Sequence, residues 1–351
     1  MKLCSIAWRG FALPFRNPYM TSRGCADARF GLLVFIGSDS GISGIGEASP
    51  IGPGTRGEVE RVAEALKGIV PRLVGMDLQS ALDASDSADL PPPLRFGLET
   101  ALLDLEGRQQ GCSLTELLGG RNVAVRVPVN ATIASASPET ACEEAEAALR
   151  AGFSSFKLKV GVGTPEQDAE LVSAVRRSVG PDARIRVDAN QAWTTGTALK
   201  AARLLSKHRL EYIEQPVAAS DVAAMAKVRR SAGVPIAADE SLCSIADLRR
   251  IIDAGAADVF ILKAARLGGL RTSLRIVGEA SGSGFPVVVT SSLESAVGIA
   301  ANIHLSAALP AHTFAHGLAT GLLFSDDLVS PPLAISNGIV SVPVSPGLGV
   351  R

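Results

Sequence analysis

The sequence has little excess charge, no pattern of paired cysteines and no long apolar run. Its 34 basic residues nearly balance 35 acidic ones, which argues against a basic surface for nucleic acid or acidic lipid. The five cysteines are odd in number and have no CxxC spacing, which disfavours a disulfide framework and a zinc knuckle. No segment has the length of a membrane span or the pattern of a signal peptide. We therefore expect a cytoplasmic protein that binds a small molecule and neither nucleic acid nor membrane, with homo-oligomerisation left open.

Two common enzyme motifs are also missing. No GxGxxG follows an early strand, and hairpin turns better explain the glycines of residues 41–46, so a Rossmann domain loses its main support. The four histidines have no metal-binding spacing such as HExxH, so we interpret them as core or surface residues. They are His208, His304, His312 and His316.

The N-terminal third of the chain alternates strand-like runs with helical patterns. The two strand-like runs and the two helical patterns cover residues 3–8, 30–36, 57–74 and 94–118. Residues 14–24 and 49–57 are rich in Pro, Gly and Ser, which favours loops that cover a site elsewhere. We therefore predict an α+β capping domain over residues 1–122.

After residue 122 the sequence pattern changes to short runs rich in β-branched residues, each followed by a helical stretch. The runs cover residues 125–133, 154–160, 185–188, 212–214, 235–239, 259–263 and 286–291. Such alternation implies a parallel sheet, and seven or eight units fit a closed barrel better than a doubly wound sheet. The predicted fold is α/β, a modified TIM-type (β/α)7β barrel over residues 123–322, with residues 323–351 returning to the capping domain.

Charged side chains interrupt the predicted barrel strands where each strand ends. They are Lys157 and Lys159 on the second strand, Asp188 on the third, Glu214 on the fourth, Asp239 on the fifth and Lys263 on the sixth. Positions 159, 188, 214, 239 and 263 are separated by 29, 26, 25 and 24 residues, the length of one βα unit. The carboxyl ends of barrel strands open on the face that carries active sites. Each residue alone has a plain structural explanation, but together they predict one site.

The three carboxylates indicate a metal. At about 4 Å and an effective dielectric near 20, each like-charged pair costs roughly 4 kcal/mol, so three acids on one rim need a cation. Oxygen ligands without histidine or cysteine favour a hard ion that keeps positions for water and substrate. We predict Mg²⁺, with Mn²⁺ as the alternative. Spacing alone does not decide between Asp239 and Glu240 as a ligand, because neighbouring residues point to opposite sides.

The lysines predict acid–base chemistry. Lys157 and Lys159 lie two residues apart on one strand and so point to the same side, while Lys263 comes from the opposite wall. A nearby metal and a second ammonium lower the pKa of a lysine towards the range of a general base. The arrangement favours removal of a proton next to a carboxylate, with the metal stabilising the enolate oxygens.

The segments FKLKV, RVDANQ, YIEQP, AADES and FILKA resemble those of the enolase superfamily, in its muconate-lactonising subgroup. The resemblance covers nearly the whole chain. It implies the capping domain, the barrel, an Mg²⁺ site and a lysine base. The implied metal ligands are Asp188, Glu214 and Asp239, and the implied acid–base pair is Lys159 and Lys263. Lys157 assists them, and Asn190 and Glu240 lie around the metal or the substrate.

Within the subgroup, the segments SSLES, HGLATG and PGLGV resemble those of the o-succinylbenzoate synthases. Residues 290–294 lack the base histidine of mandelate-racemase-like enzymes, and residues 316–320 lack the Asp-x-Asp of dipeptide epimerases. The resemblance implies dehydration of 2-succinyl-6-hydroxy-2,4-cyclohexadiene-1-carboxylate to 2-succinylbenzoate, in menaquinone or phylloquinone biosynthesis. Lys159 is then the base and Lys263 stabilises the enolate from the other face. The residues expected to surround the substrate are Thr132, Ser291, Ser292 and Leu293, with loops near Tyr19, Arg23 and Arg56 closing over its succinyl end.

Two other functions remain open. An N-succinylamino acid racemase, or another racemase or cycloisomerase of the subgroup, uses the same lysines. A barrel that binds metal without catalysis is an alternative of another class.

Overall fold

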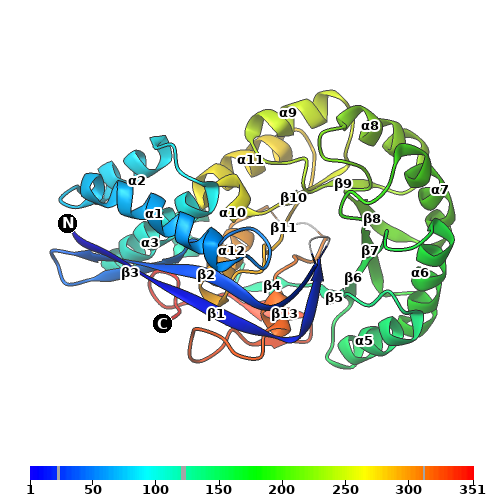
Figure 1. The fold of residues 1–351 in the computed structure, drawn as a ribbon, viewed down its shortest axis with the longest axis horizontal. Helices are drawn as coiled ribbons and strands as arrows, with labels where there is room; N and C mark the ends of the chain where they lie inside the picture. Colours follow the sequence, from blue (N-terminus) through cyan, green and yellow to red (C-terminus); the bar gives the residue numbers. More distant parts are fainter. Residues whose placement is uncertain (22–23, 120–123, 311–312) are drawn as a thin grey trace.

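The computed structural model describes residues 1–21, 24–119, 124–310 and 313–351. A three-stranded antiparallel sheet with helices packs at one side of a ring of parallel strands, whose helices α5 to α9 form an outer arc (Figure 1). Both termini lie at the end of the molecule that carries the antiparallel sheet (Figure 1). In the described part of the chain, no helix combines the length and the apolar character that crossing a membrane requires.

The antiparallel sheet and its helices are called the cap below. Its elements are β1 (Leu3–Thr21), β2 (Gly24–Ser38), β3 (Ser43–Glu47), α1 (Arg56–Leu73), α2 (Leu78–Ser87), α3 (Pro92–Gln110) and α4 (Leu114–Gly119). The side chains of Thr55 and Asp77 accept hydrogen bonds from the first turns of α1 and α2 and so fix where these helices begin. Gly46 lets β3 approach α3 closely, since a Cβ there would lie 2.0 Å from the Gly97 carbonyl oxygen.

The cap corrects two sequence predictions. Residues 14–24 were expected to form a loop, but β1 continues to Thr21; it is an edge strand, where a proline without an N–H is tolerated, and its register slips between Pro14 and Tyr19. Residues 94–118 were expected to form one helix, but α3 ends at Gln110 because Gly111 takes a left-handed φ of 69°. The helix predicted over residues 57–74 is confirmed as α1.

Seven consecutive parallel strands form the ring. They are β5 (Ala131–Ile133), β6 (Ser155–Lys159), β7 (Arg184–Asp188), β8 (Leu210–Glu214), β9 (Ile236–Ala238), β10 (Val259–Leu262) and β11 (Val287–Val289). The gap between β11 and β5 is bridged by Gly317, which pairs with Thr290, and by His316, which pairs with Val129. The predicted α/β barrel with a capping unit is therefore confirmed. Its last strand is reduced to these single bridges.

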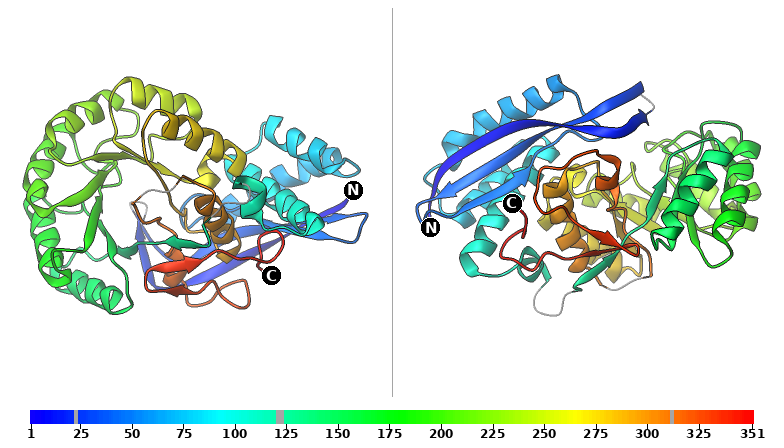
Figure 2. Two further views of the ribbon diagram at one scale, coloured as in Figure 1. Left: turned by 180° about the vertical axis from the view of Figure 1, so that it is seen from behind. Right: turned by 90° about the horizontal axis from the view of Figure 1, so that it is seen from below.

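Helices follow the strands and cover the outside of the ring. They are α5 (Pro138–Arg150), α6 (Pro165–Val179), α7 (Thr195–Leu205), α8 (Val222–Ser231), α9 (Ile245–Asp253), α10 (Ala264–Leu267), α11 (Leu270–Gly282) and α12 (Ala296–Ala307), with short 3-10 turns at Ser206–His208 and Thr320–Leu323. Thr164 and Gln167 form a reciprocal capping box at the start of α6. Seen from behind, the green helices of the barrel again lie outside its strands (Figure 2).

A small third sheet pairs a strand that precedes the ring with two strands that follow it in the chain. β4 (Arg126–Pro128) pairs with β13 (Ile339–Ser341), which pairs with β12 (Ile335–Ser336). The single strand predicted over residues 125–133 is thus wrong: Pro128, which has no N–H, ends β4 before β5 begins in another sheet. Further on, Gly347 exchanges backbone hydrogen bonds with Cys112 and Leu114 at 2.9 and 2.8 Å. The predicted boundary at residue 122 lies outside the described residues and stays a prediction.

His304 ties three segments together in its neutral form. It is fully buried on α12, and its Nδ1 accepts hydrogen bonds from the backbone N–H of Thr115 at 3.2 Å and from the Thr115 hydroxyl at 2.5 Å. With Nδ1 accepting, Nε2 carries the proton and donates to the Leu348 carbonyl at 3.1 Å. Burial lowers the pKa of His304 to about 4. The interpretation of the histidines is confirmed for His304, His208 and His316, which are buried, while His312 lies outside the described residues.

We expect His304 to make the protein less stable in acid. The unfolded chain takes up this proton near pH 6.5 and the folded chain only near pH 4, so stability is lost as the pH falls between these values. Between pH 7 and 4.5 the loss attributable to His304 should be roughly 2–3 kcal/mol. Urea unfolding at both pH values measures it, with His304→Gln as the comparison. Equal losses of stability in the two proteins would contradict this assignment.

Candidate active site

Strand register brings four of the predicted residues to one rim of the ring. Lys159 pairs with Asp188 across β6 and β7, and Asp188 pairs with Glu214 across β7 and β8. Partners in adjacent parallel strands point to the same side of the sheet, so these side chains share one face. Lys157 lies two residues before Lys159 and pairs with Thr132 of β5, so it joins the same face one layer lower.

Ion pairs join these side chains directly. Lys157 Nζ lies 2.6 Å from Glu214 Oε1 and 2.8 Å from Asp188 Oδ2. Lys159 Nζ lies 2.8 Å from the same Asp188 oxygen. All of these groups except Lys159, which is half-buried, are buried. Two ammonium groups therefore share one carboxylate in an environment of low dielectric, where charge interactions are strong.

Asp239 and Lys263 face each other on the next strands. Asp239 follows β9 directly and is fully buried, and its Oδ2 accepts a hydrogen bond from Lys263, which follows β10. Arg266 on α10 donates from Nη1 to Asp239 Oδ1 at 2.7 Å. The backbone N–H of Asp239 donates to Gln215 Oε1 at 3.0 Å and fixes the turn that carries this acid. Asp239 is thus held by two cations and one amide.

The ion pairs shift the pKa values of these groups in different directions. Burial acts against the charge on Lys157, but Asp188 and Glu214 outweigh it and raise the pKa of this ammonium well above its usual range. Burial also disfavours the charged form of Asp188, but Lys157 and Lys159 hold the pKa of Asp188 below its usual range. Unlike Asp188, Glu214 has a raised pKa: burial and then the charge of Asp188 raise it to about 8.

The lowered lysine pKa expected from the sequence is not found at Lys159. Burial and the charge of Lys157 act to lower the pKa of Lys159, but Asp188 outweighs both and raises it. For the arrangement described here the prediction is wrong, because it weighed the effect of a metal and a second ammonium but not a direct pair with the carboxylate.

The three carboxylates fit a divalent cation by chemistry rather than by a ready cage. Among the described residues, no three acid, histidine or cysteine side chains surround a common point. Their oxygens face lysine and arginine side chains instead, as the ion pairs above show. However, Glu214 Oε2 is buried and has no hydrogen-bond partner in the described part of the chain, which is costly unless another group binds it. A buried, unpaired carboxylate oxygen beside two further acids suits a hard cation such as Mg²⁺.

Asn190 and Glu240 extend the polar rim. Asn190 Oδ1 accepts a hydrogen bond from Lys159 Nζ at 2.7 Å, and its Nδ2 donates to Glu240 Oε1 at 3.0 Å. The Glu240 carboxyl is next to Asp239, and burial followed by that neighbouring charge raises the pKa of Glu240. Asn190 has a left-handed φ of 42°, which asparagine tolerates better than most residues. The two side chains therefore link Lys159 to the Asp239 side of the rim.

The turn after β11 carries the predicted Ser291, Ser292 and Leu293. Ser291 Oγ accepts hydrogen bonds from the Leu293 N–H at 2.8 Å and from the Thr320 hydroxyl at 2.7 Å. Leu293 packs in a buried apolar cluster with Leu13, Phe15 and Phe324 rather than presenting its side chain to the rim. Of these three residues, only the serines offer polar groups for a substrate.

The cap loops are only partly placed. The Tyr19 ring stacks on Phe15 with centroids 5.1 Å apart. The Arg56 guanidinium lies over the Phe30 ring, 5.3 Å from its centroid. Arg23 lies outside the described residues.

Sequence reasoning missed two arginines of the barrel interior. Arg266 follows Lys263 by three residues, and nothing in the spacing indicated that it turns back to Asp239. Arg186 pairs in register with Lys157, is fully buried, and donates from Nη1 to the Tyr212 hydroxyl at 2.9 Å and to the Ala315 carbonyl at 2.7 Å. Its position two residues before Asp188 on β7 was a usable signal, because such residues point to the same side.

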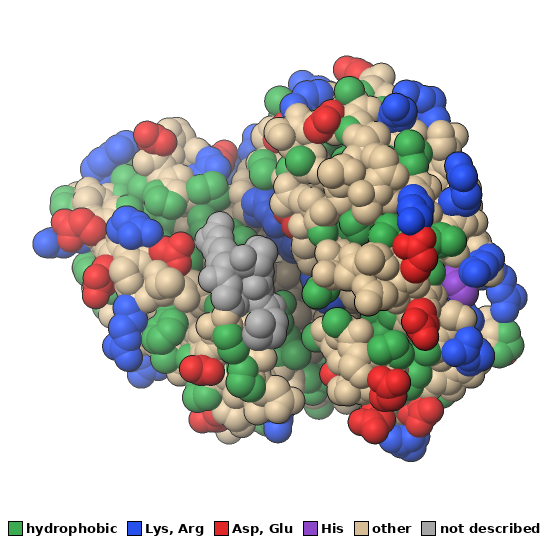
Figure 3. Space-filling model, turned by 45° about the vertical axis from the view of Figure 1, so that its right-hand side comes forward, with side chains coloured by type: hydrophobic (Ala, Val, Ile, Leu, Met, Phe, Trp, Pro, Cys, Tyr) green, Lys and Arg blue, Asp and Glu red, His purple; other side chains and the backbone are tan. Residues whose placement is uncertain are grey.

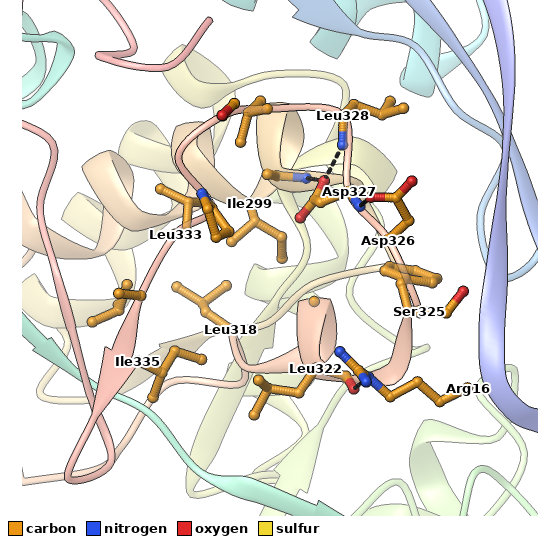
Figure 4. A pocket seen from close by; sticks show the side chains of 18 of the residues that line it. Arg16, Ile299, Leu318, Leu322, Ser325, Asp326, Asp327, Leu328, Leu333 and Ile335 are labelled. Carbon is orange, nitrogen blue, oxygen red and sulfur yellow. Dashed lines mark hydrogen bonds between the residues drawn. The ribbon is translucent and has the colours of Figure 1, made fainter.

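A cavity with a largely apolar lining lies away from these groups. It has a volume of about 750 Å³ and is lined by apolar side chains such as Ile299, Leu318 and Leu333, with Arg16 at its edge (Figure 4). None of the rim lysines or carboxylates lines it. Because none of the charged rim groups lines this cavity, its volume does not identify the chemistry. Figure 3 shows a separate feature, a furrow between the cap and the barrel.

Known proteins match the whole length of the chain. Residues 10–119 match the family described as mandelate racemase / muconate lactonizing enzyme, N-terminal domain, and residues 140–351 match the family described as enolase C-terminal domain-like. An o-succinylbenzoate synthase from Thermobifida fusca is 45% identical over 218 residues, which is 62% of this chain and 66% of that protein. An N-succinyl-L-Arg/Lys racemase from Bacillus cereus is 33% identical over 87% of this chain and 84% of its own length.

A solved structure agrees in fold over the full chain. The muconate lactonizing enzyme from Pseudomonas fluorescens, complexed with muconolactone, superposes with a TM-score of 0.94 at 30% identity and covers 100% of this chain and 96% of its own. Members of this superfamily typically use a divalent metal and act on small carboxylates. The chain therefore belongs to the enolase superfamily, in its mandelate racemase and muconate lactonizing enzyme subgroup.

Proposed function

We propose that the protein is an o-succinylbenzoate synthase, a hydro-lyase that converts 2-succinyl-6-hydroxy-2,4-cyclohexadiene-1-carboxylate to 2-succinylbenzoate in menaquinone or phylloquinone biosynthesis. The observation that carries this proposal is the 45% identity to a protein of that name, higher than the 33% to the racemase. The uncharged serines of the turn after β11 also support it, because the substrate has carboxylates and no ammonium group that would need an acidic partner.

Lys159 is the proposed base. Its Nζ sits at the end of β6, held between Asp188 and Asn190 at 2.8 and 2.7 Å, and is half-buried at the rim. As the free amine, it takes the proton from the carbon next to the substrate carboxylate. The same group then returns a proton to the leaving hydroxyl, so that water departs and no proton is gained or lost overall. Lys263 stabilises the negative charge from the opposite wall.

Asp188, Glu214 and Asp239 are the proposed ligands of a divalent cation. When bound, that cation supplies positive charge that stabilises the enolate oxygens. Lys157, which contacts both Asp188 and Glu214, holds these two carboxylates in place. Thr132 and the Ser291–Ser292 pair contribute hydrogen bonds to the substrate, and Asn190 with Glu240 positions Lys159.

An N-succinylamino acid racemase is the second candidate. The observation that favours it is the 33% identity to the Bacillus cereus racemase over 87% of this chain, more coverage than the synthase has. Lys159 and Lys263, on walls four strands apart, suit removal of a proton from one face and its return to the other. The same opposed lysines argue against a barrel that only binds metal.

We expect the synthase substrate to give an aromatic product. Formation of the ring is followed by its ultraviolet absorbance, with Mg²⁺ or Mn²⁺ present. The competing activity is measured by deuterium incorporation at the α-carbon of N-succinyl amino acids. A kcat/KM for formation of the aromatic product that exceeds the kcat/KM for deuterium exchange supports the synthase. Exchange without any aromatic product would overturn the proposal in favour of the racemase.

A further inference from the structure

The turn of residues 291–295 has an unusual shape. Leu293 has a φ of 72°, a left-handed conformation that non-glycine residues with large side chains rarely adopt. Within the turn, Ser291 Oγ accepts from the Leu293 N–H at 2.8 Å, and Glu294 Oε2 accepts from the Ser292 N–H at 2.6 Å. Such a conformation persists only where surrounding structure holds it.

Two charged residues of the cap supply that support. Arg29 of β2 donates from Nε to the Leu293 carbonyl at 2.8 Å, and it also donates from Nη1 to the Gly52 carbonyl. Glu47 at the end of β3 accepts from the Ser295 N–H at 2.9 Å and from the Ser295 hydroxyl at 2.5 Å. Glu47 also accepts from the Gly298 N–H at 3.2 Å, so its carboxylate caps the start of α12.

Both cap residues are fully buried, with 0% of their surface exposed. Burying charges is expensive, and apolar residues of similar size often hold two surfaces together at least as well. Arg29 instead donates to a carbonyl of this short turn, and Glu47 accepts from an amide and a hydroxyl of the same turn. Their placement therefore matches the fixing of backbone shape better than general adhesion of the cap.

The turn so fixed presents a hydroxyl that lacks a partner. Ser292 is only 6% exposed, and its buried Oγ has no hydrogen-bond partner among the described residues. A buried hydroxyl left without a partner is costly, and it is suited to receive a ligand. Ser291 next to it is tied to Thr320, so the pair is rigid.

We propose that Arg29 and Glu47 are positioning residues: from the cap, they hold the 291–295 turn so that its serine hydroxyls bind the substrate carboxylate that is remote from the reacting carbon. This inference rests on the proposed function, in which the substrate carries a second carboxylate. It gives the cap an effect on substrate affinity through the barrel, in addition to any loop that covers the site.

Native-state hydrogen exchange tests the positioning without a substrate. In Glu47→Gln and Arg29→Met, the amides of Ser292, Leu293 and Ser295 should exchange about tenfold faster or more, because a charged hydrogen bond is lost. Glu99→Gln is the matched control, since Glu99 of α3 accepts from the Arg271 N–H at the start of α11 and also docks the cap on the barrel. Turn amides unchanged in the first two variants, or equally accelerated in Glu99→Gln, would overturn the proposal.

Steady-state kinetics with the synthase substrate test the effect on binding. KM should rise about tenfold in Glu47→Gln and Arg29→Met while kcat stays within about threefold, and Arg29→Lys should recover part of the affinity because its ammonium can still donate to the Leu293 carbonyl. A fall in kcat at constant KM would overturn the substrate role. If wild-type protein turns over none of the proposed substrates, the proposed function fails, while hydrogen exchange still decides the positioning.

A second variant covers the case in which Glu47→Gln does not fold. Ser295→Ala removes the hydroxyl that donates to Glu47 at 2.5 Å and that accepts from the Val297 N–H at 3.3 Å at the start of α12. Faster exchange of the Leu293 amide in this variant supports the proposal, and unchanged exchange contradicts it.

Discussion

Replacing Lys159 with alanine is expected to lower kcat by about 10²–10⁴-fold, the usual contribution of a positioned general base. The ammonium is held by Asp188 and Asn190 at the end of β6, so the variant removes the proton acceptor and leaves the carboxylates in place. Lys263→Ala should lose activity in the same range. Lys159→Arg should recover nothing, because a guanidinium stays protonated, whereas Lys263→Arg should recover part, because charge alone serves at that wall.

The matched control is Lys200→Ala. Lys200 forms an exposed ion pair with Glu166 at 2.6 Å on the outside of the barrel, so its loss should change neither kcat nor KM. Initial rates with the cyclohexadiene substrate, together with thermal melting of each variant, provide the measurement. A loss of less than tenfold in both Lys159→Ala and Lys263→Ala would favour the barrel that binds metal without catalysis.

The rim of the site was predictable because its geometry follows from parallel-strand register. Each of Lys159, Asp188 and Glu214 ends a strand, and adjacent strands in a barrel bring such ends together whatever the loops do. The period of one βα unit was therefore enough to place them on one rim. The same argument holds for Asp239 and Lys263, which follow their strands directly.

The support of the site was not predictable in this way. Arg29 and Glu47 reach the turn after β11 across 264 and 248 residues, so no local pattern joins them. Arg266 depends on how α10 turns back after Lys263. The end of β1, from Pro14 to Thr21, was predicted as a loop because Pro14 and Pro18 favour loops. Only the edge position of β1 makes these prolines compatible with a strand. Sequence spacing thus predicted which side chains meet at the rim better than it predicted which residues position them.

The rim carboxylates pose an electrostatic problem that only a cation solves fully. Lys157 offsets part of the repulsion between Asp188 and Glu214, and Lys263 with Arg266 does so for Asp239. Glu214 is not fully compensated: burial and Asp188 raise its pKa to about 8, and its Oε2 has no hydrogen-bond partner within the ranges that the structure describes. Lys159 must be a free amine when it accepts the proton, so it cannot remain the permanent counter-charge of Asp188.

Removal of divalent metal by a chelator is therefore expected to lower the rate by about 10³-fold or more, since several kcal/mol of charge stabilisation are lost. Binding to the folded state alone should also stabilise it, by about 2.7 kcal/mol at a Mg²⁺ concentration one hundred times Kd. Chemical unfolding with and without Mg²⁺ measures this independently of any substrate. Glu214→Gln should abolish the stabilisation, whereas Glu166→Gln, an exposed carboxylate on α6, should retain it. Full stabilisation by Mg²⁺ in Glu214→Gln would show that the cation binds elsewhere, because an amide oxygen without charge is a poor substitute among three acidic ligands.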